Sequence, residues 1–315
     1  MERGTAMADA SHLFLEFFSE QFAVAAPTGQ LADLRFLFGP HVVADSQSPG
    51  RLRVEFTTPD EYLVRRSDGT TLLRRTFRDW GNVPPPVPPF AALRGRYRLL
   101  PAVVLAKGGA TVALVGGPGG QQAGTGFALA QLGWRFVSGR LLVVDRTTGQ
   151  TLPYLAPLEL RGEIRESVAA RGLPRGTARA RRSTLSGEVL LVRPEAAGGA
   201  VPVGARLAPP RVVRLCRGTG EAVRLVTWNR RAQTWPVVDG TEDVDGAGTP
   251  DEPDWDTYRL ELTPAGGVEE AACLIDQQWA PEGDTIDTTE KERACPAVPD
   301  TDPARPAGLT VSLPI

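Results

Sequence analysis

A glycine-rich turn between an apolar run and a short helical pattern is the part of the sequence best suited to binding a ligand. Thr111 to Val115 is apolar and β-branched, which predicts a buried strand. Glycine and proline alone make up the next segment, from Gly116 to Gly120. Phe127 to Ala130 then predicts a short helix that ends at Gly133. Strand, glycine turn and helix is the layout of a loop that binds an anion with backbone N–H groups and a helix N-terminus.

The chemistry of this turn differs from that of a working phosphate loop, whose pattern is Gly, four residues, Gly, Lys and then Ser or Thr. Counted from Gly116, a glutamine stands in the place of the lysine, and an alanine replaces the hydroxyl that binds magnesium. The candidate cofactor-binding residues therefore form a degenerate loop: Gly116, Gly119, Gly120, Gln121, Gln122 and Ala123. The same residues also fit a plain connection between a strand and a helix.

The segment from Val112 to Trp134, with the residues after it, resembles the nucleotide-binding core of the HPr kinase/phosphorylase family and its stand-alone kinase-like relatives. That family has an apolar strand, Val-Gly, a Ser-Gly-x-Gly-Lys-Ser-Thr loop, a Leu-Ala-Leu helix and Arg-Gly-Trp. Ser-Asp-Asp, an apolar strand, an Asp, a Thr-Gly turn and Pro-x-Pro follow. The matching residues here are Val115-Gly116, Leu129-Ala130, Gly133-Trp134, Ser138, Leu141 to Asp145, Thr148-Gly149, Leu152-Pro153 and Pro157-Leu158.

The resemblance covers roughly Leu34 to Trp228 and implies an α/β (α+β) fold. We expect a kinase-like core with a mixed sheet, a β-rich N-terminal half and extra strands at the C-terminus. Four segments are predicted. They are an N-terminal helix or arm (1–33), a β-rich subdomain (34–90), the kinase-like core (91–235), and an acidic loop with a C-terminal extension (236–315).

Three functional positions of the family differ in this chain. Where the family has two aspartates that act as base and metal ligand, the chain has Gly139 and Arg140. A histidine of the family falls near Leu100-Pro101, and the two histidines here, His12 and His41, lie outside the core region of the sequence. The resemblance therefore implies a pseudokinase without a cofactor, which acts as a binding or scaffold protein. Relatives that occur beside genes for ribosomally made, modified peptides imply a peptide or a modifying enzyme as the partner.

A second hypothesis is an active peptide serine kinase, or another transferase, that uses ATP and magnesium in a rearranged site. Arg140 then replaces the lysine as phosphate ligand, and Asp145 or Glu159 serves as base or metal ligand. Asp145 ends a predicted strand, where ligand sites gather in α/β sheets, but it also suits the start of a turn. A binding module for a small molecule or lipid, unrelated to nucleotides, is a third hypothesis.

The stretch from Leu158 to Arg182 carries seven arginines. Its composition predicts either a solvated, mobile loop or a surface that binds an acidic peptide, a phosphate or another anionic partner. The candidate partner-binding residues are Arg161, Arg165, Arg179, Arg181 and Arg182.

The other segments are expected to position these residues. Leu13 to Phe22 is predicted to be a short helix, and Leu34 to Phe38 a strand before a Gly-Pro turn. An antiparallel meander is predicted from Leu52–Phe56, Tyr62–Arg66 and Thr71–Arg75. The acidic stretch 239–256 is predicted to be a flexible loop, and Leu309 to Leu313 a final edge strand.

Composition limits the function classes. A net charge of -2 gives no bulk attraction to nucleic acid, so no such partner is expected. No apolar run approaches the ~18–20 residues of a membrane helix. The sequence shows no secretory signal, and its three cysteines lack metal-ligand spacing. We therefore expect a cytoplasmic protein with no metal site. Its heavy use of Ala, Gly, Pro and Arg is typical of a high-GC bacterial source.

Overall fold

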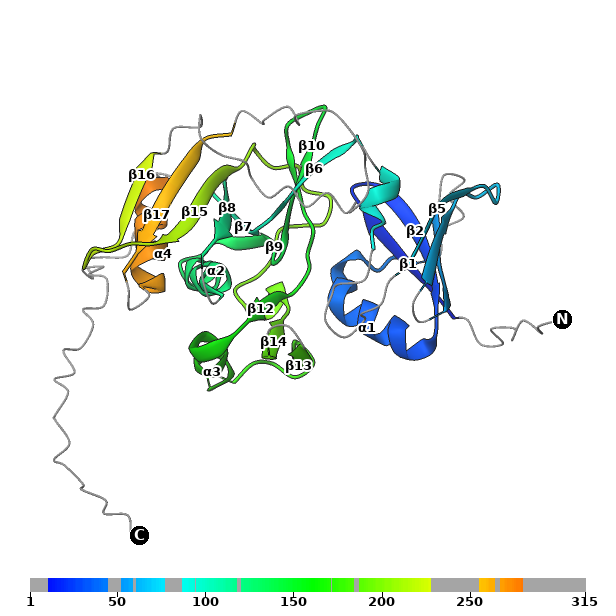
Figure 1. The fold of residues 1–315 in the computed structure, drawn as a ribbon, viewed down its shortest axis with the longest axis horizontal. Coiled ribbons are helices and arrows are strands. Elements are labelled where there is room, and N and C mark those ends of the chain that lie inside the picture. The colour runs from blue at the N-terminus through cyan, green and yellow to red at the C-terminus, as the bar shows by residue number, and fades with distance from the viewer. Residues whose placement is uncertain are drawn as a thin grey trace, which may run out of the picture. The chain divides into compact units, whose positions relative to one another are not determined.

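The computed structural model describes residues 11–44, 52–58, 61–76, 87–93, 95–117, 120–170, 172–183, 187–227, 255–263 and 267–279. Within these residues the chain has an α+β fold with several mixed sheets and few helices, which confirms the coarse fold class (Figure 1). The kinase-like core stays a prediction. Most of the acidic stretch and the predicted final strand lie outside the described residues.

The N-terminal sheet has the order β1-β2-β3-β4-β5. Its strands are β1 (Ser11–Phe17), β2 (Glu20–Ala26), β3 (Leu52–Thr58), β4 (Glu61–Arg65) and β5 (Thr71–Thr76). Strands β3 to β5 pair antiparallel, which confirms the predicted meander. Strand β2 instead pairs parallel with β3, and helix α1 (Thr28–Phe38) lies between the two in the chain.

Two N-terminal predictions are wrong. The segment predicted as a helix at Leu13–Phe22 is a hairpin, in which Phe18 and Ser19 take positive φ angles of 57° and 68°. Alternate residues of β1 are buried, so the period of two decided the structure. The strand predicted at Leu34–Phe38 is the second half of α1. Leu31, Leu34 and Phe38 share its buried face at helical spacing.

A six-stranded sheet holds the glycine turn. Its order is β16 (Arg224–Thr227), β17 (Thr257–Leu262), β15 (Arg211–Arg217), β8 (Ala110–Gly116), β7 (Val103–Lys107) and β9 (Arg135–Ser138). Strands β8, β15 and β17 are parallel. Their carboxyl ends therefore meet at one edge, where the glycine turn follows β8.

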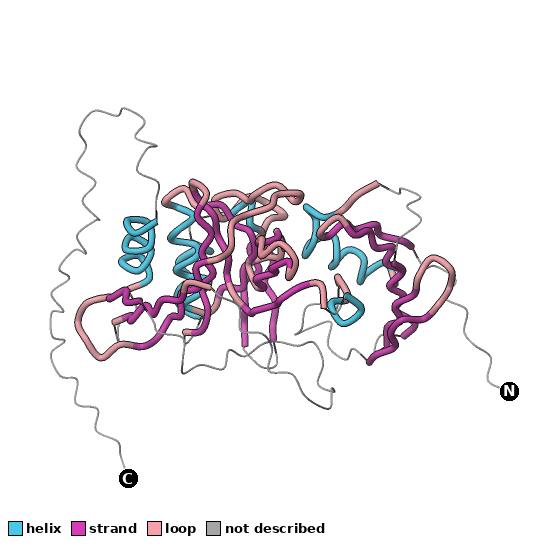
Figure 2. Tube along the Cα trace, turned by 90° about the horizontal axis from the view of Figure 1, so that it is seen from above, coloured by secondary structure: helices cyan, strands magenta, loops and turns pink. Residues whose placement is uncertain are grey.

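The central strand faces two hydrophobic clusters because its side chains alternate between the faces of the sheet. Val112 and Leu114 pack with helices α2 (Gln121–Gln131) and α4 (Val268–Trp279), which lie on one face (Figure 2). Ala113 and Val115 pack on the other face with Leu142 of β10 (Leu141–Asp145). Each fully buried Val or Leu contributes about 1.5–3 kcal/mol to folding. Helix α4 was not predicted.

Two three-stranded sheets complete the described part. One pairs β6 (Tyr97–Pro101), β10 (Leu141–Asp145) and β11 (Thr151–Leu152). The other has the order β12 (Leu158–Leu160), β14 (Gly187–Val192) and β13 (Ala178–Ser183). Because helix α3 (Gly162–Ala170) follows β12, the loop predicted from Leu158 to Arg182 is wrong for most of its length. Short 3-10 turns lie at Gly39–His41, Phe90–Leu93 and Pro194–Ala196.

His41 connects the N-terminal sheet to the segment after β11. Its imidazole is fully buried and stacks on Phe17, with ring centroids 4.1 Å apart. The backbone N–H of Leu155 donates to Nε2 (3.0 Å), and Nδ1 lies 2.8 Å from the carbonyl oxygen of Glu16. Neutral His41 with its proton on Nδ1 satisfies both contacts. Burial lowers the pKa of His41 to about 4, although the bond to Glu16 opposes this shift.

None of the helices in the described part of the chain combines the length and the apolar character that crossing a membrane requires.

Candidate functional site

The predicted strand, glycine turn and helix are present. Gly116 ends β8, and Gly116 and Gly117 have φ angles of 71° and 87°. Residues 118–119 lie outside the described part. Gly120, with a φ of 89°, is the last residue before α2. The helix begins at Gln121, six residues earlier than the apolar pattern predicted, so the loop glutamines lie in its first turn.

The turn is packed tightly against the parallel neighbour β15. A Cβ atom at Gly117 would lie 3.0 Å from Cβ of Leu215, and one at Gly116 would lie 3.4 Å from the Leu215 carbonyl oxygen. Glycine is needed here both for the positive φ angles and for this close approach. Packing alone therefore accounts for two of the loop glycines.

The side chains at the start of α2 are neutral. Gln121 and Gln122 are half-buried, and Ala123 is buried. Oε1 of Gln121 is shielded from solvent and accepts no hydrogen bond within the described residues. The first turn of α2 thus has an amide group where a phosphate loop has an ammonium group, and a methyl group where it has a hydroxyl.

The turn between β9 and β10 is built by Ser138 and Gly139. Oγ of the buried Ser138 accepts the N–H groups of Arg140 (3.2 Å) and Leu141 (3.0 Å). A Cβ atom at Gly139 would lie 2.7 Å from three backbone atoms of residues 156–158. Backbone cannot move aside as a flexible side chain can. The position at which the resembled family has an aspartate therefore has no room for a side chain.

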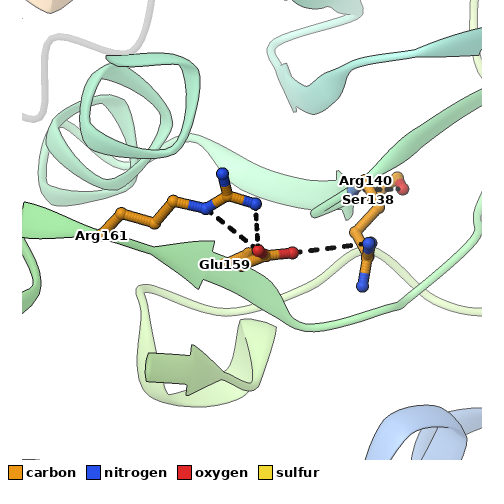
Figure 3. A network of polar contacts seen from close by, with 4 residues as sticks. All are labelled: Ser138, Arg140, Glu159 and Arg161. Atoms are coloured by element: carbon orange, nitrogen blue, oxygen red, sulfur yellow. Dashed lines mark hydrogen bonds and ion pairs between the residues drawn. The ribbon is translucent and has the colours of Figure 1, made fainter. Parts of the chain in front are cut away.

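A cluster of Arg140, Glu159 and Arg161, called here the Glu159 cluster, lies beside this turn (Figure 3). A guanidinium nitrogen of Arg140 is 3.4 Å from Glu159 Oε2. Arg161 donates to Oε1 from Nε at 3.0 Å and also from a terminal nitrogen. Both carboxylate oxygens of Glu159 therefore face arginine. Burial lowers the pKa of Arg140, and the charge of Glu159 opposes that shift.

The Glu159 cluster is adjacent to the glycine turn. A Cβ atom at Gly120 would lie 3.6 Å from Cβ of Arg161 and 3.9 Å from its backbone nitrogen. The fold thus brings together two of the three catalytic candidates, Arg140 and Glu159, with the first turn of α2. In this arrangement the carboxylate is held by two cations.

The third candidate, Asp145, lies apart from them. Its Oδ1 accepts the N–H groups of Thr147 (2.7 Å) and Thr148 (3.1 Å), so Asp145 has the contacts of a residue that starts a turn. Arg140 immediately precedes β10 and Asp145 ends it. Five residues of strand separate the two backbones by about 16 Å. Asp145 and Arg140 therefore do not form one catalytic centre.

The five predicted partner-binding arginines are in different environments. Arg161 belongs to the Glu159 cluster. Arg165 pairs with Glu188 and Glu166, while Arg179 pairs with Asp33 and stacks over Phe36. Arg181 is half-buried on β13. The side chain of Arg182 lies outside the described residues.

Sequence reasoning missed the contacts of the glycine turn with residues that are remote in the sequence. Leu215 and Arg214 come from β15, about 100 residues further along the chain than the turn they contact. No local pattern indicates such a parallel pairing. A second missed set lies at the opposite end of β8. There Asp276 of α4 accepts from Lys107 Nζ (2.7 Å) and Trp134 Nε1 (2.8 Å).

The residues present do not fit the magnesium nucleotide that the family resemblance implies. Phosphoryl transfer needs cations on the phosphates and oxygen ligands on the metal. Gln122 can donate only a neutral hydrogen bond, Ala123 has no hydroxyl, and Gly139 cannot be replaced by a carboxylate without moving backbone. Glu159 already forms ion pairs with two arginines.

Comparison with protein-family models finds no match to this chain, and comparison with curated protein sequences finds none either.

Proposed function

We propose that this protein is a pseudokinase that resembles the HPr kinase/phosphorylase family and acts as a binding or scaffold protein. One observation carries the proposal. The backbone of residues 156–158 fills the space at Gly139 in which the family has a carboxylate. A strand and a glycine turn that keep their form, beside a position that cannot bear a side chain, are typical of an architecture retained without its chemistry.

The charges near the turn support the same proposal. Phosphoryl transfer depends on positioning and on neutralising the developing charge, mostly with lysine and magnesium. Here the carboxylate of Glu159, near the turn, is held between Arg140 and Arg161, so both of its oxygens already contact cations. A metal ion would have to compete with these two arginines for Glu159.

The partner that we propose is a peptide, or an enzyme that modifies a ribosomally made peptide. This part of the proposal comes from the family resemblance. It is supported by the arginines that surround the glycine turn, because guanidinium groups suit the carboxylates of a peptide or of a protein surface.

The proposal is tested by calorimetric titration of the full chain with ATP in the presence and absence of magnesium, followed by a phosphotransfer assay. We expect no magnesium-dependent binding at micromolar concentrations and no phosphotransfer to serine peptides. Magnesium-dependent binding of ATP at micromolar concentrations, with transfer of its γ-phosphate, would replace the pseudokinase by the alternative, an active peptide serine kinase with a rearranged site.

A further inference from the structure

The arginines of the basic stretch divide into those whose charge is matched by a carboxylate and those whose charge is not. Arg165 is matched, because it lies between Glu188 and Glu166. Arg179 is also matched, since it pairs with Asp33 of α1. These two side chains have structural roles between neighbouring elements, and each has little charge left to offer a ligand.

Of three other arginines, two share a single carboxylate and the third has none within the described residues. Arg140 and Arg161 both contact Glu159, whereas Arg181 makes no ion pair with any residue that the structure describes. Two positive charges therefore remain in excess. The charges of Arg181 and Arg161 both act to lower the pKa of Arg140, which is the effect of nearby cations.

Glu159 and Arg181 lie on one face of the sheet formed by β12, β14 and β13. Glu159 is opposite Leu191, and Arg181 is opposite Val189. Leu191 and Val189 are two residues apart on β14, so all four side chains share one face. Strands β12 and β13 flank β14 and are thus about 10 Å apart. Arg161 follows β12 directly and exposes 43% of its side chain, so a ligand can reach it.

We propose that Arg161 and Arg181, with the Arg140–Glu159 pair beside them, form a binding site for the carboxylates of an acidic peptide. This inference rests on the proposed function and names the chemistry of its partner. The contact that we expect between a peptide carboxylate and arginine already occurs within the molecule. There the carboxylate of Glu159 accepts hydrogen bonds from both Nε and a terminal nitrogen of Arg161. A peptide carboxylate can contact Arg181 in the same way.

The geometry favours two carboxylates over one phosphate group. Arg161 and Arg181 extend from strands about 10 Å apart, a separation that an extended peptide spans with acidic side chains two or three residues apart. Glu159 lies beside Arg161 and would repel the double charge of a phosphate dianion more strongly than the single charge of a carboxylate.

The test is calorimetric titration of the full chain, without nucleotide and at low salt, with an acetylated hexaglutamate peptide. A hexaglutamine peptide and inorganic phosphate are the comparison ligands. Of the three ligands, we expect only hexaglutamate to bind. Arg181→Gln and Arg161→Gln should each lower the affinity for hexaglutamate about tenfold. Arg165→Gln is the matched control, because it removes the same charge from a side chain that is already paired. We expect this control to bind as the wild type does.

Three outcomes would overturn the inference. The first is that hexaglutamate does not bind. The second is that Arg165→Gln and Arg181→Gln lose the same affinity for hexaglutamate. The third is that phosphate binds in place of the peptide and that this binding depends on Arg181. The unfolding midpoint of each variant shows whether it has folded, and Arg181→Gln breaks no ion pair within the described residues. The peptide titration contains no nucleotide, so its result is independent of the phosphotransfer assay. Phosphotransfer by the wild type in that assay would contradict the proposed function but not the binding of the peptide.

Discussion

Glu159 and Gly139 are the two residues that decide the chemistry near the glycine turn. Glu159 is the carboxylate there, and it is held by two guanidinium groups. Gly139 stands where a second carboxylate would be needed, and the backbone of residues 156–158 closes that space. The first residue has its charge matched by cations, and the second is limited by packing. Both effects act against metal binding.

The packing at Gly139 leads to a prediction about stability. Gly139→Ala places a methyl group 2.7 Å from three backbone atoms, so the turn must shift. We expect a loss of about 1–3 kcal/mol in the free energy of unfolding, and a larger loss for Gly139→Asp because a charge is also buried. Urea denaturation measures both variants. Gly204→Ala is the control, since an added Cβ at Gly204 meets no atom within 4 Å. Equal stability of Gly139→Ala and Gly204→Ala would contradict the packing argument.

At the scale of elements, the glycine turn joins the end of β8 to the start of α2, and the side chains in the first turn of α2 are neutral. The tight contact of Gly117 with Leu215 holds the described part of the turn, and this contact does not depend on the side chains in the first turn of α2. Helix α2 has its own supports. Ile164 of α3 packs so closely on Gly124 that a Cβ there would lie 2.4 Å from Cδ1. The frame is therefore independent of the residues that would bind phosphate.

This independence predicts that the loop can be given charge without loss of the fold. The triple substitution Gln121→Gly, Gln122→Lys and Ala123→Ser restores the pattern of a working loop. A charge-assisted contact with phosphate contributes about 1.5–3 kcal/mol, so nucleotide affinity should rise roughly ten- to a hundredfold. Phosphotransfer should still fail, because Gly139 and Arg140 supply no carboxylate.

Titration with ATP compares the triple variant with the wild type. The matched control carries Gln122→Met in place of Gln122→Lys, which keeps the length of the side chain without its charge. A triple variant that binds no better than this control would contradict the expected charge-assisted contact between the new lysine and phosphate.

At the scale of the whole described chain, His41 makes stability depend on pH. The buried imidazole is neutral, with its pKa lowered from 6.5 to about 4. The unfolded chain therefore binds a proton between pH 6.5 and pH 4 that the folded chain does not bind. Stability contributed by this residue is complete above pH 6.5 and is lost as the pH falls through that window, by about 3 kcal/mol in all.

Urea denaturation of the wild type and of His41→Gln at pH 7 and pH 4.5 isolates this effect from the titration of carboxylates. We expect the stability of the wild type to fall more than that of His41→Gln between the two pH values. His12→Gln, which changes an exposed histidine, should retain the dependence of the wild type. The same pH dependence in His41→Gln as in the wild type would refute the assignment.

Local pattern in the sequence determined much of the architecture. Alternation and β-branching predicted β3 to β5, and the strand before Gly116 follows from its apolar run. Helix α4 carries a helical pattern too, with Ala271, Ile275 and Trp279 buried four residues apart, so local pattern also accounts for this helix. The apolar residues from Leu13 to Phe22 fit both the helical period and the strand period of two. Only the pairing of β1 with β2 and the burial of alternate residues decided between a hairpin and a helix.

The features of the candidate site also divide into those that the sequence indicates and those that only the tertiary structure decides. The order of residues was enough to identify the glycine turn, the missing lysine and hydroxyl, and Arg140 with Glu159 as candidates. Only the tertiary structure decided that Glu159 lies between Arg140 and Arg161, that Asp145 starts a turn, and that Gly139 has no space beside it. The physical reason is that charge pairing and close packing depend on distances between segments remote in the chain, whereas periodicity and turn propensity act within a few residues.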